Sequence, residues 1–389
     1  MSPVEAARSL LDRALPLYRD SPAVDRLRAL RSRVDGPLRV AVTGAPGSGR
    51  TTLLNAVVGE PVAAGSARLT VDWPGDVELV DAGADGGPAD AGDVRLHLLP
   101  HPGADARVLR AHDPVTTLVV LSRADELAGG RVDALLSARR VAKRQAQGEL
   151  GLLCQDVLAV SGLLALGAAT LTAPEVQALE AFARVAKAEL DAALLSADRF
   201  TTASPRQAPA LLARLGLFGV RWSTAEARRG STGAALVAEV ARASGIVELR
   251  EAIGTRFAHR AAAFRARSAL TALDAVLRRD PRPATLPLVE DLERALTNLH
   301  DLSELRALAD LDTGRCALGE AEPEARYLLG AHGTTPAARL SASDDAHGAL
   351  LRWRSHAEDP RLTTRDRRTA AVVARTCERL LTQSPLTAR

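Results

Sequence analysis

The chain has 389 residues, of which 47% are hydrophobic and 25% are charged, so it can hold two domains and has the composition of an ordinary globular protein. A formal charge of +3 is too small to indicate a nucleic-acid partner, and lysine occurs only at Lys143 and Lys187. Three well-separated cysteines and the lack of an apolar leader argue against a disulfide framework, a metal site and a signal peptide, so we expect a cytoplasmic protein.

The first 36 residues are predicted to form two helices. Apolar residues recur at helical spacing from Leu10 to Leu15, and Pro16 is expected to break this run. Ser21 and Pro22 then supply a helix cap followed by proline at the first helical position. We expect these helices to join a bundle formed by the second half of the chain.

Residues 37–225 alternate short apolar runs with helical segments such as 131–147. Near-continuous apolar strands of this kind are typical of a mostly parallel sheet with helices on both faces, so the predicted fold class is α/β. The predicted strands are LRVAVTG, RLTVDW, VELVDA, DVRLHLL, TTLVVLS and DVLAVSG, which begin at residues 38, 68, 77, 93, 116 and 156.

One apolar segment is long enough to be considered for a membrane span. The 18 residues between Asp156 and Glu175 are uncharged, which is about the minimum length for a spanning helix. The segment also contains Ser161, Gly162, Gly167 and a terminal proline. A buried strand followed by a loop is therefore the preferred interpretation.

From residue 226 onward the pattern is helical throughout. A long helical stripe is expected to start at a Ser244 cap and to end before Pro281. Residues 226–389 are therefore predicted to form an α-helical bundle. Its further helices are expected near 286–310, 322–331, 343–357 and 363–383, separated by glycine or proline.

The segment GAPGSGRT follows the first predicted strand and opens a helix, as a phosphate-binding P-loop does. Its glycines allow backbone N–H groups to curl around phosphates, and the helix dipole favours negative charge. Residues 37–225 are therefore predicted to be a P-loop GTPase-like domain. The nucleotide-binding residues expected here are Gly44, Gly47, Ser48, Gly49, Arg50, Thr51 and Thr52.

Arg50 stands at the position that lysine occupies in the motif. A lysine ammonium is a compact charge that fits among loop carbonyls and phosphate oxygens, whereas arginine carries a broad planar fork on a longer stem. Two placements are open from the sequence. Arg50 either reaches the phosphates from outside the loop or points to solvent.

Two later strand ends supply candidate base-binding residues. SRAD, at the end of a buried strand, stands where a guanine-specificity loop belongs, and Asp125 can accept the two N–H groups that guanine presents. Arg123 is placed to lie over the purine, next to Ser122. Ser161 and Gly162, at the tip of the last predicted strand, are expected to complete the site.

With these motifs in place, the chain resembles the bacterial dynamin-like GTPases of actinobacteria, the group that includes the isoniazid-inducible proteins. The resemblance implies a guanine-nucleotide domain joined to a helical neck, built partly from the N-terminal helices. It also implies a cytosolic protein that acts on membranes, usually through paired GTPase domains. The segments that carry the resemblance are LDRALPLYRDSP, PLRVAVTGAPGSGRTTLLNAVVGE, VVLSRADELAGGRVDALLSARRVA, LCQDVLAVSGLLA, LLARLGLFGVR, ASGIVELREAI and RARSALTALDAVL.

The chain departs from this family between the P-loop and the second switch. The family places a switch I threonine there, but Ser66 and Thr70 are the only hydroxyl residues in the gap, and Thr70 is expected to lie in a strand. The DTPG of switch II reads DAGA, so Asp81 is retained and Ala84 replaces the glycine that meets the γ-phosphate.

Three functions remain open from the sequence. A working GTPase would bind GTP and Mg²⁺ and would use Arg50, Thr51 and Asp81 for catalysis, with Thr51 and Asp81 holding the metal. A degenerate GTPase would keep the fold, hydrolyse GTP very slowly or not at all, and act as partner of a complete dynamin-like paralogue. A P-loop ATPase or kinase is disfavoured by Asp125. A homodimer and peripheral contact with the inner membrane face are also expected possibilities.

Overall fold

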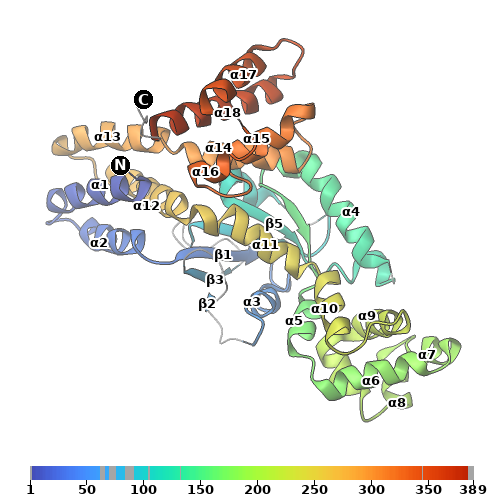
Figure 1. Ribbon diagram of the computed structural model, residues 1–389. Coiled ribbons are helices and arrows are strands. Elements are labelled where there is room, and N and C mark those ends of the chain that lie inside the picture. Colours follow the sequence, from blue (N-terminus) through green and yellow to red (C-terminus); the bar gives the residue numbers. More distant parts are fainter. Residues whose placement is uncertain are drawn as a thin grey trace.

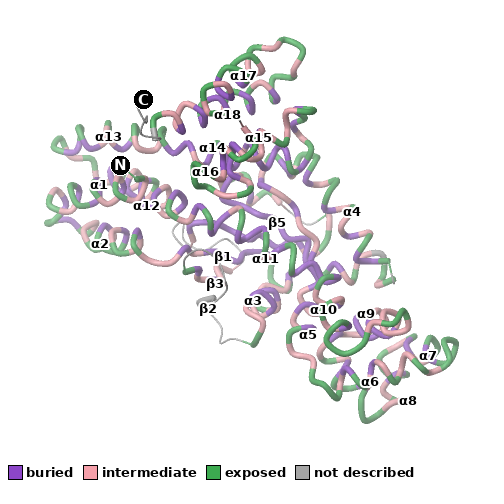
Figure 2. Tube along the Cα trace, in the orientation of Figure 1, coloured by how far each residue is buried: buried purple, intermediate pink, exposed green. Residues whose placement is uncertain are grey.

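The computed structural model describes residues 2–61, 66–69, 76–83, 92–103, 106–131, 133–343 and 345–383 (Figure 1). A central sheet is surrounded by helices from both halves of the chain, and a further group of helices extends away from it (Figure 1). Buried residues concentrate in the sheet and on the helix faces turned toward it (Figure 2).

The sheet has six strands in the order β2-β3-β1-β4-β5-β6 across the described ranges. β1 is parallel to β3 and β4, β5 is parallel to β4 and β6, and β2 is antiparallel to β3 at the edge. The mostly parallel α/β class is therefore confirmed. The strand bounds are β1 Leu38–Gly44, β2 Ser66–Leu69, β3 Val77–Gly83, β4 Val94–Leu99, β5 Thr117–Leu121 and β6 Val157–Ala159.

The two faces of the sheet pack against different helices, because successive strand residues point to opposite sides. One face carries Val42, Leu96 and Leu118 and packs in a single core with α3 (Arg50–Val58), α11 (Ile246–Arg256) and α14 (His300–Asp312). On the other face, Val119 and Leu121 pack against α4 (Ala134–Gln147). Helices from the C-terminal half therefore cover the same sheet that carries the P-loop.

The segment after β6 is a helix, so the predicted loop at this place is wrong. Ser161 accepts a hydrogen bond from the Leu164 amide at 3.3 Å and caps the new helix. The leucines and alanines that follow are strong helix formers, and they start a separate apolar core. Its helices are α5 Gly162–Thr170, α6 Ala173–Arg184, α7 Lys187–Ala193, α8 Ala197–Ala203, α9 Ala208–Arg228 and α10 Gly233–Ala243.

Glycines bring α5 close to its neighbours at both ends. A Cβ on Gly162 would lie 3.4 Å from the Thr52 methyl group at the start of α3. A Cβ on Gly167 would lie 2.8 Å from the Arg214 carbonyl on α9, and one on Gly219 would lie 3.0 Å from Leu164. α5 therefore bridges the P-loop helix and α9.

The N-terminal helices share a core with helices from later in the chain. α1 (Pro3–Leu17) and α2 (Ala23–Val34) pack with α12 (Ala261–Arg279) and α13 (Leu286–Thr297). Pro16 lies inside the last turn of α1, so the break comes slightly later than expected. Ser21 accepts from the Ala23 amide at 3.2 Å, and Pro22 precedes α2 instead of opening it.

The last helices of the chain form a further core around Trp353, which is fully buried. The long stripe from residue 244 is interrupted at η5 (Ala258–Arg260), and its cap is Gly245 in the left-handed conformation instead of Ser244. A cap with a φ of 83° suits glycine, which has no Cβ to clash. The Trp353 core is formed by the end of α14 with α15 Glu322–Leu328, α17 Ala346–Glu358 and α18 Thr364–Gln383, and the short helix α16 spans Pro336–Arg339.

A buried ionic network joins several of these elements. Glu304 on α14 is 1% exposed and accepts hydrogen bonds from both terminal nitrogens of Arg339, at 2.7 and 2.8 Å. The Thr376 hydroxyl on α18 donates to the same carboxylate at 2.8 Å, and Arg260 approaches it at 3.6 Å. One carboxylate therefore holds α14, α16, α18 and the turn before α12 together.

Within the described ranges, no helix combines the length and apolar character needed to cross a bilayer.

Candidate nucleotide site

Three loops predicted to form the site converge at the carboxyl ends of neighbouring strands. The Ser122 hydroxyl after β5 donates to the Ser48 carbonyl of the P-loop at 2.8 Å. The Ala124 amide donates to the Val160 carbonyl after β6 at 3.3 Å. This edge of an open parallel sheet, where strand order reverses around β1, is the place where ligands bind in such folds.

The P-loop has a backbone shaped for an anion. Gly47 and Gly49 adopt φ angles of 77° and 88°, and a Cβ at either position would meet no atom within 4 Å. Gly49 caps α3, whose first-turn amides have no acceptor within the helix. The segment 44–52 therefore fits the phosphates of a nucleotide, with the amides of Gly49, Arg50, Thr51 and Thr52 at the helix start.

Arg50 adopts neither of the two placements left open by the sequence. Its Nε donates to the Asp81 carboxylate at 2.9 Å, and one terminal nitrogen donates to the Gly44 carbonyl and, at 3.3 Å, to the Ala45 carbonyl. The side chain is 21% exposed and its partner Asp81 is 25% exposed. The guanidinium therefore ties the start of the P-loop to the end of β3.

The same contacts occupy the acid expected to hold Mg²⁺. Asp81 Oδ1 accepts from Arg50 Nε and also from the Gly83 amide at 3.1 Å. Thr51, the other expected metal ligand, is exposed at the first turn of α3. A cation at Oδ1 would have to displace this guanidinium, and one at Oδ2 would lie next to its positive charge, so the donor set as it stands does not favour a metal ion.

The residues of the specificity loop contact the P-loop. Arg123 has a φ of 53°, in the left-handed region that non-glycine residues rarely adopt. One of its terminal nitrogens donates to the Gly47 carbonyl at 2.8 Å, and the other donates to Glu126 at 3.0 Å. Ser122 is buried and also donates to Leu99. Arg123 therefore lies against the P-loop backbone, beside the expected purine position.

Asp125 is partly buried, and its carboxylate makes no hydrogen bond or ion pair with any residue that the structure describes. An unengaged carboxylate at a strand end can accept hydrogen bonds from a ligand. Ser161 has a structural role as the cap of α5, and Gly162 packs against Thr52 and Leu53. The structure thus brings all twelve predicted binding residues to one edge of the sheet, while their roles toward nucleotide stay predictions.

His97 lies in β4, directly beside Thr43 of the P-loop strand β1. Its Nδ1 is 2.9 Å from the Thr43 hydroxyl, and the side chain is 4% exposed. Burial lowers the pKa of His97 to about 4, and the nearby positive charge of Arg95 acts in the same direction. A neutral imidazole therefore supports β1 beneath the loop.

The sequence analysis missed the bridge from Arg50 to Asp81. The sequence does indicate that such a bridge is possible, because an arginine at the lysine position is long enough to reach the end of the neighbouring parallel strand. Thr70 and Ala84, the positions used to argue for altered switches, lie outside the described residues. Ser66 begins the antiparallel edge strand β2.

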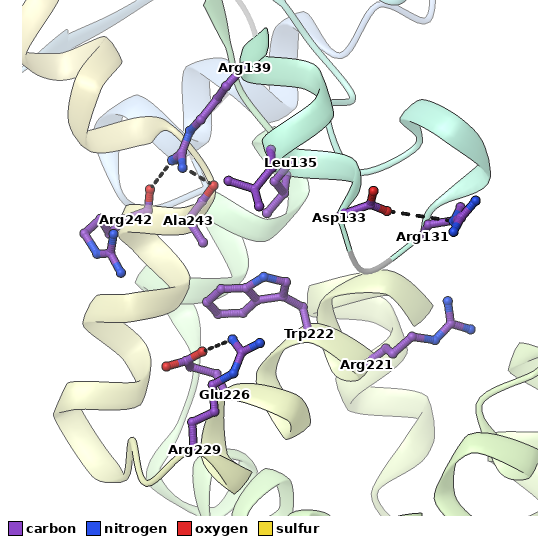
Figure 3. A pocket seen from close by; sticks show the side chains of 11 residues that line it. Arg131, Asp133, Leu135, Arg139, Arg221, Trp222, Glu226, Arg229, Arg242 and Ala243 are labelled. Carbon is purple, nitrogen blue, oxygen red and sulfur yellow. Dashed lines mark hydrogen bonds and ion pairs between the residues drawn. The ribbon is translucent and has the colours of Figure 1, made fainter. Parts of the chain in front are cut away.

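A separate surface cavity of about 700 Å³ lies between α4 and the helices α9 and α10 (Figure 3). Trp222 stands at its centre, and arginines surround it (Figure 3). Arg139 donates to the Arg242 carbonyl at 2.9 Å, and Arg229 donates to Glu226 at 2.8 Å. The lining of this cavity has none of the predicted nucleotide-binding residues.

Known proteins similar to this chain were found by sequence. Isoniazid-induced protein IniC, from two strains of Mycobacterium tuberculosis (CDC 1551 / Oshkosh and ATCC 25618 / H37Rv), is 31% identical over 467 residues, which cover 92% of this chain and 94% of the relative. The chain belongs to the actinobacterial dynamin-like family. Because the alignment is longer than the 389 residues of this chain, the relative has residues without a counterpart here.

No protein-family model matches the chain. Among solved structures, a GTP-binding protein from Sulfolobus solfataricus in complex with GDP covers 42% of this dynamin-like chain and 62% of its own, with 16% identity and a TM-score of 0.24.

Proposed function

We propose that this dynamin-like protein binds guanine nucleotide at the P-loop and hydrolyses GTP very slowly or not at all. The observation that carries the proposal is the ion pair between Arg50 and Asp81 across the mouth of the loop. The guanidinium stands between the loop and the carboxylate that would otherwise organise a metal ion. Nucleotide binding needs the loop amides and Asp125, whereas hydrolysis also needs a positioned water and groups that stabilise charge on the transferred phosphoryl group.

The expected defect in hydrolysis follows from how phosphoryl transfer is catalysed. The reaction depends on positioning the attacking water and on stabilising charge at the transferred phosphoryl group. Here the lysine is replaced by an arginine that is engaged elsewhere. The sequence between Thr51 and Asp81 is also short. Each loss removes transition-state stabilisation, and together they disfavour turnover.

An active Mg²⁺-dependent GTPase is the second candidate. The exposed hydroxyl position of Thr51 at the start of α3 and the retained Asp81 at the end of β3 favour it. This function would require Arg50 to leave Asp81 when GTP and Mg²⁺ bind. A P-loop ATPase or kinase has less support, because an unengaged Asp125 suits guanine and not adenine.

For the whole protein, we propose a role as partner of a complete dynamin-like GTPase in a membrane-related process. A nucleotide domain with a weak hydrolytic cycle can still present a fixed surface to a domain that completes the cycle. Pairing of two copies of this chain is the alternative. Contact with the inner face of the membrane would then come through the partner.

Calorimetric titration with GTP, GDP and ATP, with and without Mg²⁺, tests the proposal. We expect guanine nucleotides to bind, ATP to bind at least about tenfold more weakly, and Mg²⁺ to change the GDP affinity by no more than about twofold. Equal affinity for ATP and GTP would contradict the guanine assignment. Strict dependence on Mg²⁺ together with rapid GTP turnover would favour the second candidate.

A further inference from the structure

A second polar cavity, of about 360 Å³, lies where the amino ends of β4 and β5 meet α2 and α12. It is on the opposite edge of the sheet from the P-loop. The α12 residues in its lining, at positions 267, 268, 271, 272, 275 and 279, follow helical spacing, so one face of α12 forms a wall. We call this space the junction cavity and define it by Arg26, Arg95, His112, Asp113, Arg267 and Arg279.

Arg95 is the unusual member of the junction cavity. It is only 9% exposed, and its strand neighbours in the sheet are the uncharged Ala41 and Thr117. Its guanidinium makes no hydrogen bond or ion pair with any residue in the described ranges, and its Nε is completely buried without a partner. Burial lowers the pKa of Arg95. A buried cation without a counter-charge is strongly unfavourable, so this position calls for an anion.

The carboxylates in the lining are already engaged by other arginines. Asp93 pairs with Arg33 at 3.2 Å and accepts from the Arg39 amide at 3.0 Å. Asp113 pairs with Arg267 and accepts from the Val115 amide at 2.9 Å. Neither acid contacts Arg95, although both lie in the same lining.

The rest of the wall adds donors and further positive charge. Burial and the charge of Arg95 lower the pKa of His112, so its imidazole is neutral and can donate one N–H. Arg279 is exposed on the wall that α12 provides. A phosphoryl group matches this set, because a guanidinium offers two parallel donors to its oxygens and because several cations surround one space.

We propose that the junction cavity binds a phosphoryl group, held by Arg95 and completed by His112 and Arg279. The cavity is large enough for a phosphorylated small molecule, and the same chemistry is offered by a lipid phosphate headgroup. A phosphoryl group bound here contacts both the sheet and α12. It therefore joins the nucleotide-binding half of the molecule to the helices that pack with α1 and α2, independently of what the P-loop binds.

Thermal unfolding and calorimetry with inorganic phosphate at constant ionic strength test this site. We expect saturable stabilisation of the wild-type protein by phosphate. In Arg95→Met we expect phosphate binding at the cavity to weaken roughly ten- to a hundredfold, the effect of removing hydrogen bonds from a charged group. Without phosphate, Arg95→Met should unfold at the same or a higher temperature, because it removes an unpaired buried charge.

Two further variants distinguish phosphate binding at this cavity from binding at the P-loop, and distinguish a loss of binding from a loss of folding. Gly47→Val strains the P-loop at a φ of 77°, and the phosphate response of the junction cavity should survive in it. Arg279→Gln, on the exposed end of α12, should weaken the response several-fold without unfolding the protein, whereas Arg278→Gln, which removes an exposed pair with Asp274, should not.

The source of the phosphoryl group is distinguished by comparing glycerol phosphate with phosphatidylcholine vesicles that contain or lack phosphatidic acid. Arg95-dependent binding of glycerol phosphate identifies a soluble ligand, and Arg95-dependent binding confined to acidic vesicles identifies a headgroup. The proposal is overturned if wild-type protein shows no phosphate response, or if the response is the same in Arg95→Met or is lost in Gly47→Val alone.

Discussion

At the scale of single residues, the arginine of the P-loop has the largest functional consequence. Arg50 in the P-loop supplies the counter-charge for Asp81. Two charged groups that usually face a ligand therefore pair with each other. The presence of the loop could be predicted from its glycines and its strand–loop–helix context. The direction of the arginine could not, because it depends on the tertiary position of a carboxylate on another strand.

Replacing Arg50 with lysine is expected to leave GTP turnover low. The substitution frees Asp81 from the guanidinium but does not supply the missing residues between the P-loop and switch II, so the steady-state rate should stay within about tenfold of wild type. The same variant should make GDP binding more sensitive to Mg²⁺, since Asp81 becomes free. A rate typical of active dynamin-like GTPases that is abolished by Thr51→Ala would contradict this view.

Replacing Asp125 with alanine is expected to weaken GDP binding by roughly 1–3 kcal/mol, because two guanine donors lose their acceptor. Calorimetry with GDP measures the change. Asp133→Ala is the matched control, since Asp133 is an exposed acid a few residues further along the same loop. If both variants bind GDP as the wild type does, Asp125 has no part in base recognition.

His97 is expected to make stability depend on pH below neutrality. Its pKa in the folded state is about 4, below the unfolded value of about 6.5, so the unfolded chain binds more protons in this window. The free energy of unfolding should therefore fall as the pH falls from 7 toward 4, by up to about 3 kcal/mol from this residue.

Urea unfolding at pH 7 and pH 5 checks this dependence. His97→Asn keeps a polar atom near the Thr43 hydroxyl but does not titrate, so the loss of stability between the two pH values should be smaller than in wild type. His347→Asn, at an exposed histidine, should behave as wild type. An unchanged pH dependence in His97→Asn would show that other groups cause it.

At the scale of elements, the strands could be predicted from sequence and one group of helices could not. The five parallel strands β1, β3, β4, β5 and β6 are short valine- and leucine-rich runs between turns, and they lie where expected. The segment after β6 has the same apolar composition without a helical stripe, because α5 contacts neighbours on several sides. A helix buried on most of its surface cannot be separated from a buried loop by periodicity alone.

The ionic network around Glu304 is expected to dominate the stability of the C-terminal helices. In Glu304→Gln, Arg339 and Arg260 lose a buried counter-charge, which should lower the free energy of unfolding by roughly 3–5 kcal/mol. Chemical unfolding followed by circular dichroism measures this loss. Asp359→Asn, which breaks an exposed pair with Arg361, should change stability by less than about 1 kcal/mol. A small effect of Glu304→Gln would show that the buried network around Glu304 contributes little to the free energy of unfolding.

At the scale of the whole molecule, the sheet is packed between helices from both ends of the chain. α1 and α2 share a core with α12 and α13, and α11 and α14 cover the sheet face that also receives α3. The family resemblance predicted that the N-terminal helices pack with helices from the second half of the chain. It did not predict that α11 and α14 pack on the sheet, which only the folded structure reveals. Helical periodicity shows which side of a helix is apolar and does not show what covers it.

Mixing this protein with a complete dynamin-like GTPase of the same organism is expected to yield a complex and to change the hydrolysis rate of that GTPase. Co-purification and a phosphate-release assay measure the two effects, with Arg50→Lys as a variant that should still form the complex. This chain alone should bind liposomes weakly or not at all. GTP-dependent tubulation of liposomes by this chain alone would rule out the partner role.

The helix α5 links the P-loop helix α3 to the group of helices α6 to α10. Its first residue, Gly162, packs against Thr52 in the P-loop helix, and Gly167 packs so closely against the Arg214 carbonyl and the Leu215 side chain of α9 that a Cβ would clash there. α5 is a short helix that packs closely on both α3 and α9, so it links their positions. We therefore expect a small displacement of α3 to move α5, and with it the helices α6 to α10 that share its core.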